Sequence, residues 1–153
     1  MTVAIPAPSP SQNLDAACAS VAGQIARTDG KASLLLAFDG AVLAGLASLA
    51  DTGLPTAAKV FGALAVVALG AAAVLLLLVV RPRLDGTDRA SFPHWAQLDE
   101  DGIRACMDGD TRPAQVQVLS TIAMAKFIRL RRAVDCSLAA LALLALAAAG
   151  TAW

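Results

Sequence analysis

The pattern of hydrophobic and polar positions includes one uninterrupted apolar run, from Val60 to Val80, without a charged or strongly polar side chain. At about 1.5 Å of rise per residue, an α-helix of this length is about 30 Å long, which matches the hydrocarbon core of a bilayer. The run therefore predicts a membrane-spanning helix over residues 60–80.

Two further segments are apolar enough to cross a membrane. Residues 32–50 are apolar except for three side chains: Ser33, Asp39 and Ser48. A turn signal over 51–55 follows, and the short connection predicts an antiparallel hairpin of the first two spans. Residues 134–153 contain a Leu/Ala run that ends on Trp153, a residue type typical of membrane interfaces. Since no alternating strand pattern is present, we expect an all-α integral membrane protein with three transmembrane helices.

Amphipathic stretches precede the first and the third span. Apolar residues recur there at helical spacing: Leu14, Cys18, Val21 and Ile25 in one stretch, and Val116, Leu119, Ala123 and Phe127 in the other. We expect each stretch to extend its span as a cytoplasmic helix, and the two to pack together so that both stripes are buried. The acidic, Gly-rich segment between them predicts a loop with a short helix around 98–107.

The ends of the chain set the expected domain organisation. Residues 1–12 are rich in Pro, Ala and Ser, which predicts a disordered tail. They lack the basic start and apolar stretch of a secretory signal, so no signal peptide is expected. Residues 13–153 are expected to form a single membrane domain, since the chain has no room for a second sizeable one.

Composition and charge agree with this picture and add an orientation. Hydrophobic residues make up 58% of the 153 residues and charged residues 16%, a balance typical of membrane proteins. The net charge is zero, so no overall field indicates a nucleic-acid partner. Of the 12 Lys and Arg residues, only Lys59 lies in the hairpin turn. The positive-inside rule therefore predicts that the amino terminus and residues 81–132 are cytoplasmic.

A polar cluster, Arg27-Thr-Asp-Gly-Lys-Ala-Ser33, lies at the entry to the first span. On a helix, Arg27 and Lys31 lie one turn apart on one face and can together hold a phosphate. The alternative is that both are positive anchors at the bilayer interface, with Asp29 as a local counter-charge. Gly30 in the same cluster indicates a hinge or the close approach of another backbone.

Asp39 lies about two turns into the first span, where an ionisable group is costly and faces protein or water. It is either a functional residue or a group neutralised by protonation or by a hydrogen bond to a neighbouring helix. Gly40 and Gly45 beside it would permit close contact with another helix, either of the same chain or of a second copy.

The remaining chemistry-bearing residues indicate no catalytic or metal site. The three cysteines, Cys18, Cys106 and Cys136, have no CxxC spacing, and His94 is the only histidine. A zinc site would need further ligands of these types. No nucleophile elbow or phosphate loop is present, so we expect no enzyme, no catalytic residues, no metal and no tightly bound cofactor.

The order of these features resembles a bacterial family. The entry cluster is followed by Leu34-Leu-Leu-Ala-Phe-Asp-Gly40, a second span, and an insert that opens with an aromatic-rich patch; a helix from Gln115 to Arg132 then leads into the last span. This arrangement resembles the membrane effector of Pycsar antiphage systems, the PycTM-like family. The sequence departs from the family pattern at Gly30, where Thr is common, and at Asp39, where Asn is usual.

The resemblance implies an antiphage defence effector, active in abortive infection, in the bacterial inner membrane. Such an effector impairs the membrane in response to a cyclic pyrimidine nucleotide, cUMP or cCMP, made by a partner cyclase. No cyclic-nucleotide-binding β-barrel is evident, so the implied ligand site lies at the cytoplasmic helix ends. Its candidate residues are Arg27, Asp29, Lys31, Lys126 and Arg129. The expected partners are the lipid bilayer, the cyclase and further copies of the chain.

Three alternatives remain open at this point. One is an effector of the SLATT type, linked to other nucleotide messengers. Another is a small membrane scaffold subunit without nucleotide sensing. A proton-coupled transporter built on Asp39 is the third and the weakest, because one buried carboxylate makes a poor proton relay.

Overall fold

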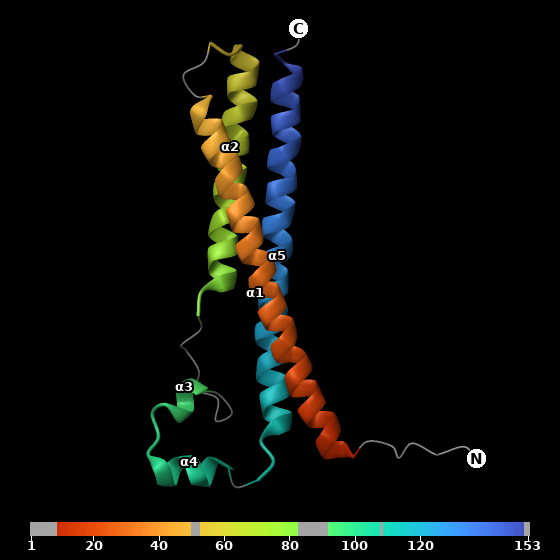
Figure 1. The fold of residues 1–153 in the computed structure, drawn as a ribbon, viewed down its shortest axis with the longest axis vertical. Helices are drawn as coiled ribbons and strands as arrows, with labels where there is room; N and C mark the ends of the chain where they lie inside the picture. The colour runs from red at the N-terminus through yellow and green to blue at the C-terminus, as the bar shows by residue number, and fades with distance from the viewer. Residues whose placement is uncertain (1–8, 50–52, 83–91, 108, 152–153) are drawn as a thin grey trace, which may run out of the picture. The chain divides into compact units, whose positions relative to one another are not determined.

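A computed structural model describes residues 9–49, 53–82, 92–107 and 109–151. Their helices are α1 (Pro10–Ser48), α2 (Thr56–Val80), α3 (Phe92–Trp95), α4 (Glu100–Met107) and α5 (Arg112–Ala149) (Figure 1). The described residues contain no strand, and α1, α2 and α5 are long and apolar enough to cross a membrane. The predicted all-α fold with three spanning helices is confirmed.

The chain divides into two compact units. Unit 1 comprises Met1–Ala26 and Pro82–Ala125, and unit 2 comprises Arg27–Arg81 and Lys126–Trp153. Helices α1 and α5 each contribute their first part to unit 1 and their second part to unit 2. The three predicted spans therefore all belong to unit 2.

Helix α1 begins inside the predicted tail, at Pro10. The Ser9 backbone N–H donates to Gln12 Oε1 at 3.0 Å, and the Gln12 backbone N–H donates to Ser9 Oγ at 3.4 Å. This reciprocal pair is a capping box, and proline is favoured at the first helical position. Residues 9–12 thus start the helix, whereas residues 1–8 of the predicted tail lie outside the described part.

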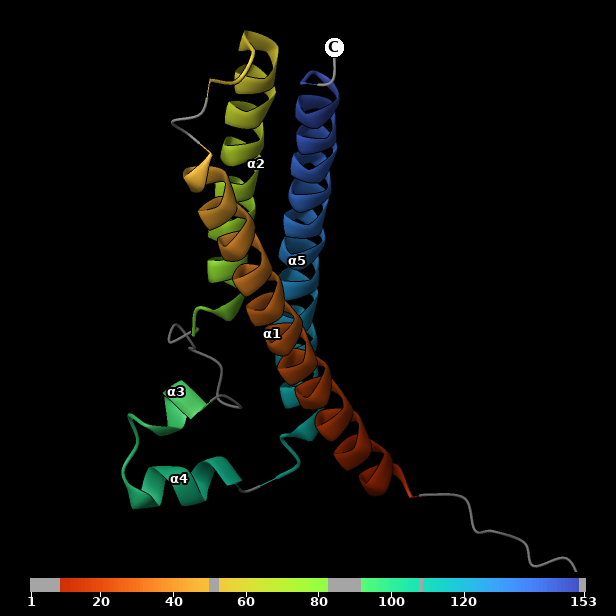
Figure 2. The same ribbon diagram turned by 45° about the horizontal axis from the view of Figure 1, so that its top comes forward.

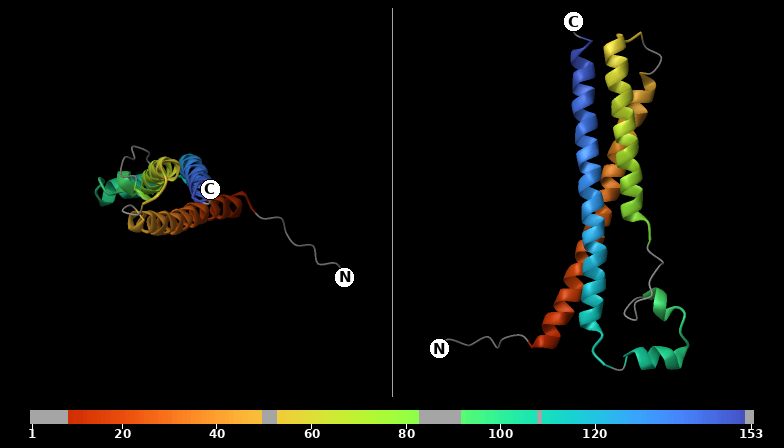
Figure 3. Two further views of the ribbon diagram at one scale, coloured as in Figure 1. Left: turned by 90° about the horizontal axis from the view of Figure 1, so that it is seen from above. Right: turned by 180° about the vertical axis from the view of Figure 1, so that it is seen from behind.

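Three helices pack side by side in unit 2, where α1 crosses α2 and α5 obliquely (Figures 1, 2 and 3). The buried positions of α2 form one stripe: Ala58, Ala65, Leu69, Ala72, Leu76 and Val79. Other large apolar side chains of this helix are exposed, including Val67 at 70% and Val74 at 58%. Large apolar side chains that no other described helix covers are suited to contact with hydrocarbon, as expected for a membrane-spanning helix.

The core of unit 2 consists of two apolar clusters at different depths. The first contains Ala32 of α1, Leu76 and Val79 of α2, and Leu130 and Ala133 of α5. The second contains Ala65 and Leu69 of α2 with Ala140 of α5, and half-buried residues of α1 pack against it. Both clusters draw on all three helices, so each fixes the rotation of the helices about their own axes.

Unit 1 holds α3, α4 and the first turns of α1 and α5. Asp99 caps α4, since its Oδ1 accepts from the Gly102 backbone N–H at 2.8 Å. The short helix predicted around 98–107 is therefore present as α4. Within this unit Arg112 joins α5 to α1: its guanidinium donates to Asp15 Oδ1 at 3.1 Å and to the Ser11 carbonyl oxygen at 3.2 Å.

The same arginine also fixes the start of α5. Asp110 Oδ1 accepts from Arg112 Nε at 2.8 Å and from the Arg112 backbone N–H at 3.1 Å. The side-chain hydrogen bond from Arg112 lowers the pKa of the Asp110 carboxyl below its usual value. A carboxyl with a lowered pKa stabilises the fold above its unfolded pKa, near 4, and this contribution is lost as the pH falls through the folded value.

We expect Arg112→Gln to loosen the link between α1 and α5 in unit 1, because the substitution removes the charged donor shared by Asp15 and Asp110. Hydrogen exchange of the backbone amides over residues 10–26 should become faster, while exchange over the spanning helices stays unchanged. Arg104→Gln is the matched control, since Arg104 is 73% exposed and, among the described residues, pairs with Glu100 and Asp101 of its own helix. Equal exchange in both variants would refute the link.

Candidate functional site

One end of unit 2 carries the residues singled out in the sequence. We call it the basic end and define it by Arg27, Asp29 and Lys31 of α1 with Lys126 and Arg129 of α5. Helix α1 runs without interruption through this region. A Cβ placed on Gly30 would meet nothing within 4 Å, and the same holds for Gly40 and Gly45. The expectation that these glycines mark close contact with another helix is therefore wrong within the chain.

Asp29 and Lys126 form an ion pair between α1 and α5, with Lys126 Nζ donating to Asp29 Oδ1 at 2.5 Å. The side chains are only 14% exposed at Lys126 and 35% exposed at Asp29. Asp29 is thus the partner of a lysine on another helix, and no ion pair joins it to Arg27 or Lys31 of its own helix. The pair fixes the lateral position of α1 against α5 at the basic end.

The other three predicted site residues are not brought together by direct contacts. Arg27 and Lys31 are exposed and Arg129 is half-buried. Among the residues that the structure describes, none of the three makes an ion pair. The charges of Arg27, Lys31 and Arg129 add to those of the Asp29–Lys126 pair, so the basic end carries a net positive charge that attracts anions.

A second polar contact lies deeper in the span, between the two apolar clusters. Asp39 of α1 is fully buried, and Ser137 of α5 is 6% exposed. The Ser137 hydroxyl lies within donating distance of three acceptors: Asp39 Oδ1 at 3.1 Å, Asp39 Oδ2 at 3.2 Å and the Ala133 carbonyl oxygen at 3.2 Å. Its single hydrogen is shared among them. Of the two alternatives for Asp39, this contact supports a hydrogen bond to a neighbouring helix.

Ser137 is the partner that the sequence reasoning missed. A serine inside the third apolar run is the signal that could have pointed to it, because polar side chains within spans hydrogen-bond across helices. Thr28 was missed as well: it is 2% exposed and shares the packed face of α1 with Ala32 and Asp39. Over the described part of the chain, no group of three His, Cys, Asp or Glu side chains could hold a metal ion.

These features define the class: a small integral membrane protein with three spanning helices, a buried polar contact between two of them, and one strongly basic end. The family model for the Pycsar effector protein domain, PycTM, matches residues 13–153, so the chain belongs to this family. The protein is accordingly an antiphage membrane effector, and PycTM is not a known family of enzymes. No match was found among curated proteins or among solved structures.

Proposed function

We propose that this effector impairs the bacterial inner membrane when a cyclic pyrimidine nucleotide, cUMP or cCMP, binds at the basic end. The nucleotide is made by a partner cyclase upon infection. One observation supports the site assignment: three cations at the basic end have no carboxylate partner among the described residues, namely Arg27, Lys31 and Arg129. The fourth cation, Lys126, has its carboxylate partner on a different spanning helix. The orientation in which the basic end faces the cytoplasm follows from the positive-inside rule.

The ligand is held through its phosphodiester group. Arg27 and Lys31 lie one helical turn apart and both are exposed, so both can donate to one phosphate. The arginine fork can bind two phosphate oxygens at once, and the lysine acts as a point charge. Arg129 on α5 supplies a further donor from the neighbouring helix.

The response follows from competition at Lys126. A phosphate that accepts from Lys126 replaces Asp29 and weakens the tie between α1 and α5. Ligand binding must favour the arrangement in which the Asp29–Lys126 ion pair is broken, since a ligand with equal affinity for both arrangements does not change their populations. A shift from about 1:99 to 99:1 requires about 5.5 kcal/mol of differential affinity. Only hydrogen bonds that form when the Asp29–Lys126 ion pair is broken count toward this difference, and the bond from Lys126 to the phosphate is one of them, at about 1.5–3 kcal/mol.

We expect Arg27→Ala combined with Lys31→Ala to weaken nucleotide binding by at least about tenfold, because two charge-assisted hydrogen bonds are removed. The measurement is equilibrium binding of labelled cUMP and cCMP to the full-length protein in lipid nanodiscs.

Arg131→Ala combined with Arg132→Ala is the matched control. Both residues are exposed, both lie on α5 outside the candidate site, and the change in charge is the same. If neither nucleotide binds the unaltered protein, the sensing proposal fails. If the two double variants bind equally well, the site assignment fails.

A further inference from the structure

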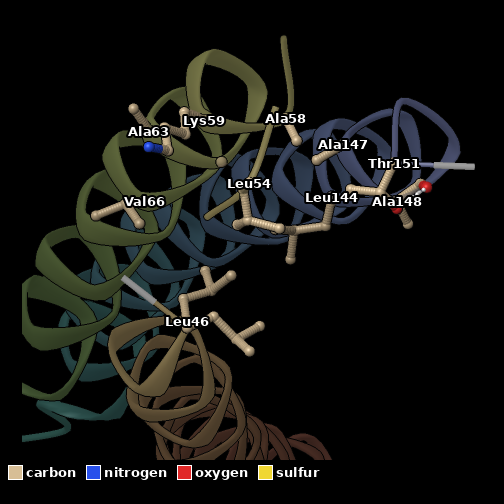
Figure 4. Close-up of a pocket in the computed structure, with 12 residues that line it drawn as sticks. Leu46, Leu54, Ala58, Lys59, Ala63, Val66, Leu144, Ala147, Ala148 and Thr151 are labelled. Atoms are coloured by element: carbon tan, nitrogen blue, oxygen red, sulfur yellow. Dashed lines mark hydrogen bonds between the residues drawn. The ribbon is translucent and has the colours of Figure 1, made fainter. Parts of the chain in front are cut away.

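A groove opens at the end of unit 2 opposite the basic end, where the hairpin turn lies; we call this the hairpin end. Its volume is about 470 Å³, and its lining comes from α1, the hairpin turn, α2 and α5 (Figure 4). Small side chains from α2 and α5, among them Ala58, Ala63 and Ala147, leave the space open. Larger side chains border it, including Leu46 from α1 and Leu144 from α5.

The depth of the groove can be estimated from the α2 residues that line it. They extend from Ala58 to Val66. At about 1.5 Å per residue, this stretch covers the outer 12 Å or so of the span. The groove thus begins where the helix enters the bilayer and continues into the hydrocarbon region.

A single lysine, Lys59, lies at the outer end of this apolar lining. Lys59 lies in the first turn of α2, is exposed, and belongs to the lining of the groove. It is the only Lys or Arg between Lys31 and Arg81 in the sequence. An apolar groove with a cation at the interface is complementary to a molecule with an anionic head and an apolar tail.

We propose that the groove binds one acyl chain of an anionic phospholipid, whose phosphate is held by Lys59. A water molecule occupies about 30 Å³ of the liquid, and a methylene group is of similar size. The groove therefore has room for on the order of fifteen methylenes, about the length of a common acyl chain. The bound chain fills space between the ends of α1, α2 and α5 that the side chains leave open. This inference does not depend on nucleotide sensing.

Gly62 offers a direct test, because it lines the groove and a Cβ placed on it would meet nothing within 4 Å. Gly62→Leu should occupy the groove without displacing the backbone. Gly70→Leu is the matched control on the same helix: its added Cβ also meets open space, and it lies outside the lining. Lys59→Gln removes the charge and leaves the groove open.

The experiment is native mass spectrometry of the full-length protein released from bilayers of phosphatidylglycerol and phosphatidylethanolamine. We expect one retained lipid per chain in the unaltered protein and in Gly70→Leu, and its loss in Gly62→Leu. Lys59→Gln should retain lipid, but its preference for phosphatidylglycerol over phosphatidylethanolamine should fall about fivefold, which is the effect of removing one cation near an anionic lipid.

Several results would overturn the proposal. One is equal lipid retention in Gly62→Leu and Gly70→Leu, which would place the bound lipid elsewhere. Another is an unchanged lipid preference in Lys59→Gln, which would remove the headgroup assignment. A dimer without lipid that dissociates in Gly62→Leu would show that a second copy of the chain occupies the groove.

Discussion

The variant Lys126→Glu should lower the stability of the protein by on the order of 2 kcal/mol. The substitution places a second carboxylate beside Asp29 at a position where the lysine side chain is only 14% exposed. Two like charges about 4 Å apart repel by about 4 kcal/mol at the effective dielectric of a protein surface, and the partial exposure of Asp29 reduces this figure. Thermal unfolding of the full-length protein in detergent, followed by circular dichroism, measures the loss.

The exchanged pair, Asp29→Lys with Lys126→Glu, tests whether the loss comes from this contact. The ion pair is restored with opposite polarity, so most of the stability should return. Arg132→Glu makes the same change in charge at an exposed position of α5 and should have little effect. If the exchanged pair remains unstable, or if Lys126→Glu and Arg132→Glu lose equal stability, the ion pair does not hold α1 against α5.

The buried contact between Asp39 and Ser137 should tolerate Asp39→Asn but not Asp39→Ala. The Ser137 hydroxyl has one hydrogen and three acceptor oxygens within reach. An Asn amide group at position 39 can donate to Ser137 Oγ, which leaves the hydroxyl hydrogen for the Ala133 carbonyl oxygen. Asparagine is also the residue expected here from the family resemblance. Asp39→Asn should therefore be at least as stable as the unaltered protein.

Asp39→Ala removes the hydrogen bond and leaves a void at a fully buried position. Hydrogen bonds between spanning helices contribute about 0.6 kcal/mol on average and about 1.7 kcal/mol at most, and the void adds to the loss. Unfolding in detergent should show a clear decrease for Asp39→Ala and for Ser137→Ala. The matched control is Ser33→Ala, an exposed serine of the same helix. A loss in Asp39→Asn as large as in Asp39→Ala would show that the carboxylate itself is required.

The helical class and the number of spans could be predicted because these properties are local. A run such as Val60–Val80 must form a helix in hydrocarbon, where each backbone polar group needs a partner within the segment. The start of α1 is also local, but the Pro- and Ser-rich composition concealed it. Ser9 and Gln12 carry the capping signal there, and it is visible only when their spacing is considered together with Pro10.

The candidate site was predicted as a set of residues, but its contacts were not. Asp29 and Lys126 are separated by 97 positions in the chain, and both were candidates for the ligand site. The structure pairs them with each other and leaves Arg27, Lys31 and Arg129 as cations without an ion pair among the described residues. Which residues pair depends on the rotation and depth of α1 and α5, and packing in the two apolar clusters sets both.

From its sequence the protein can be assigned to a membrane, to three spanning helices and to a family, because span length, apolar content and the entry cluster at Arg27–Ser33 are properties of contiguous segments. Three features required the tertiary structure: the tie between Asp29 and Lys126, the contact between Asp39 and Ser137, and the groove at the hairpin end. Each of them joins helices that are distant in the chain. The physical reason is that the bilayer determines how long a helix must be, whereas side-chain packing determines which residues of two helices meet.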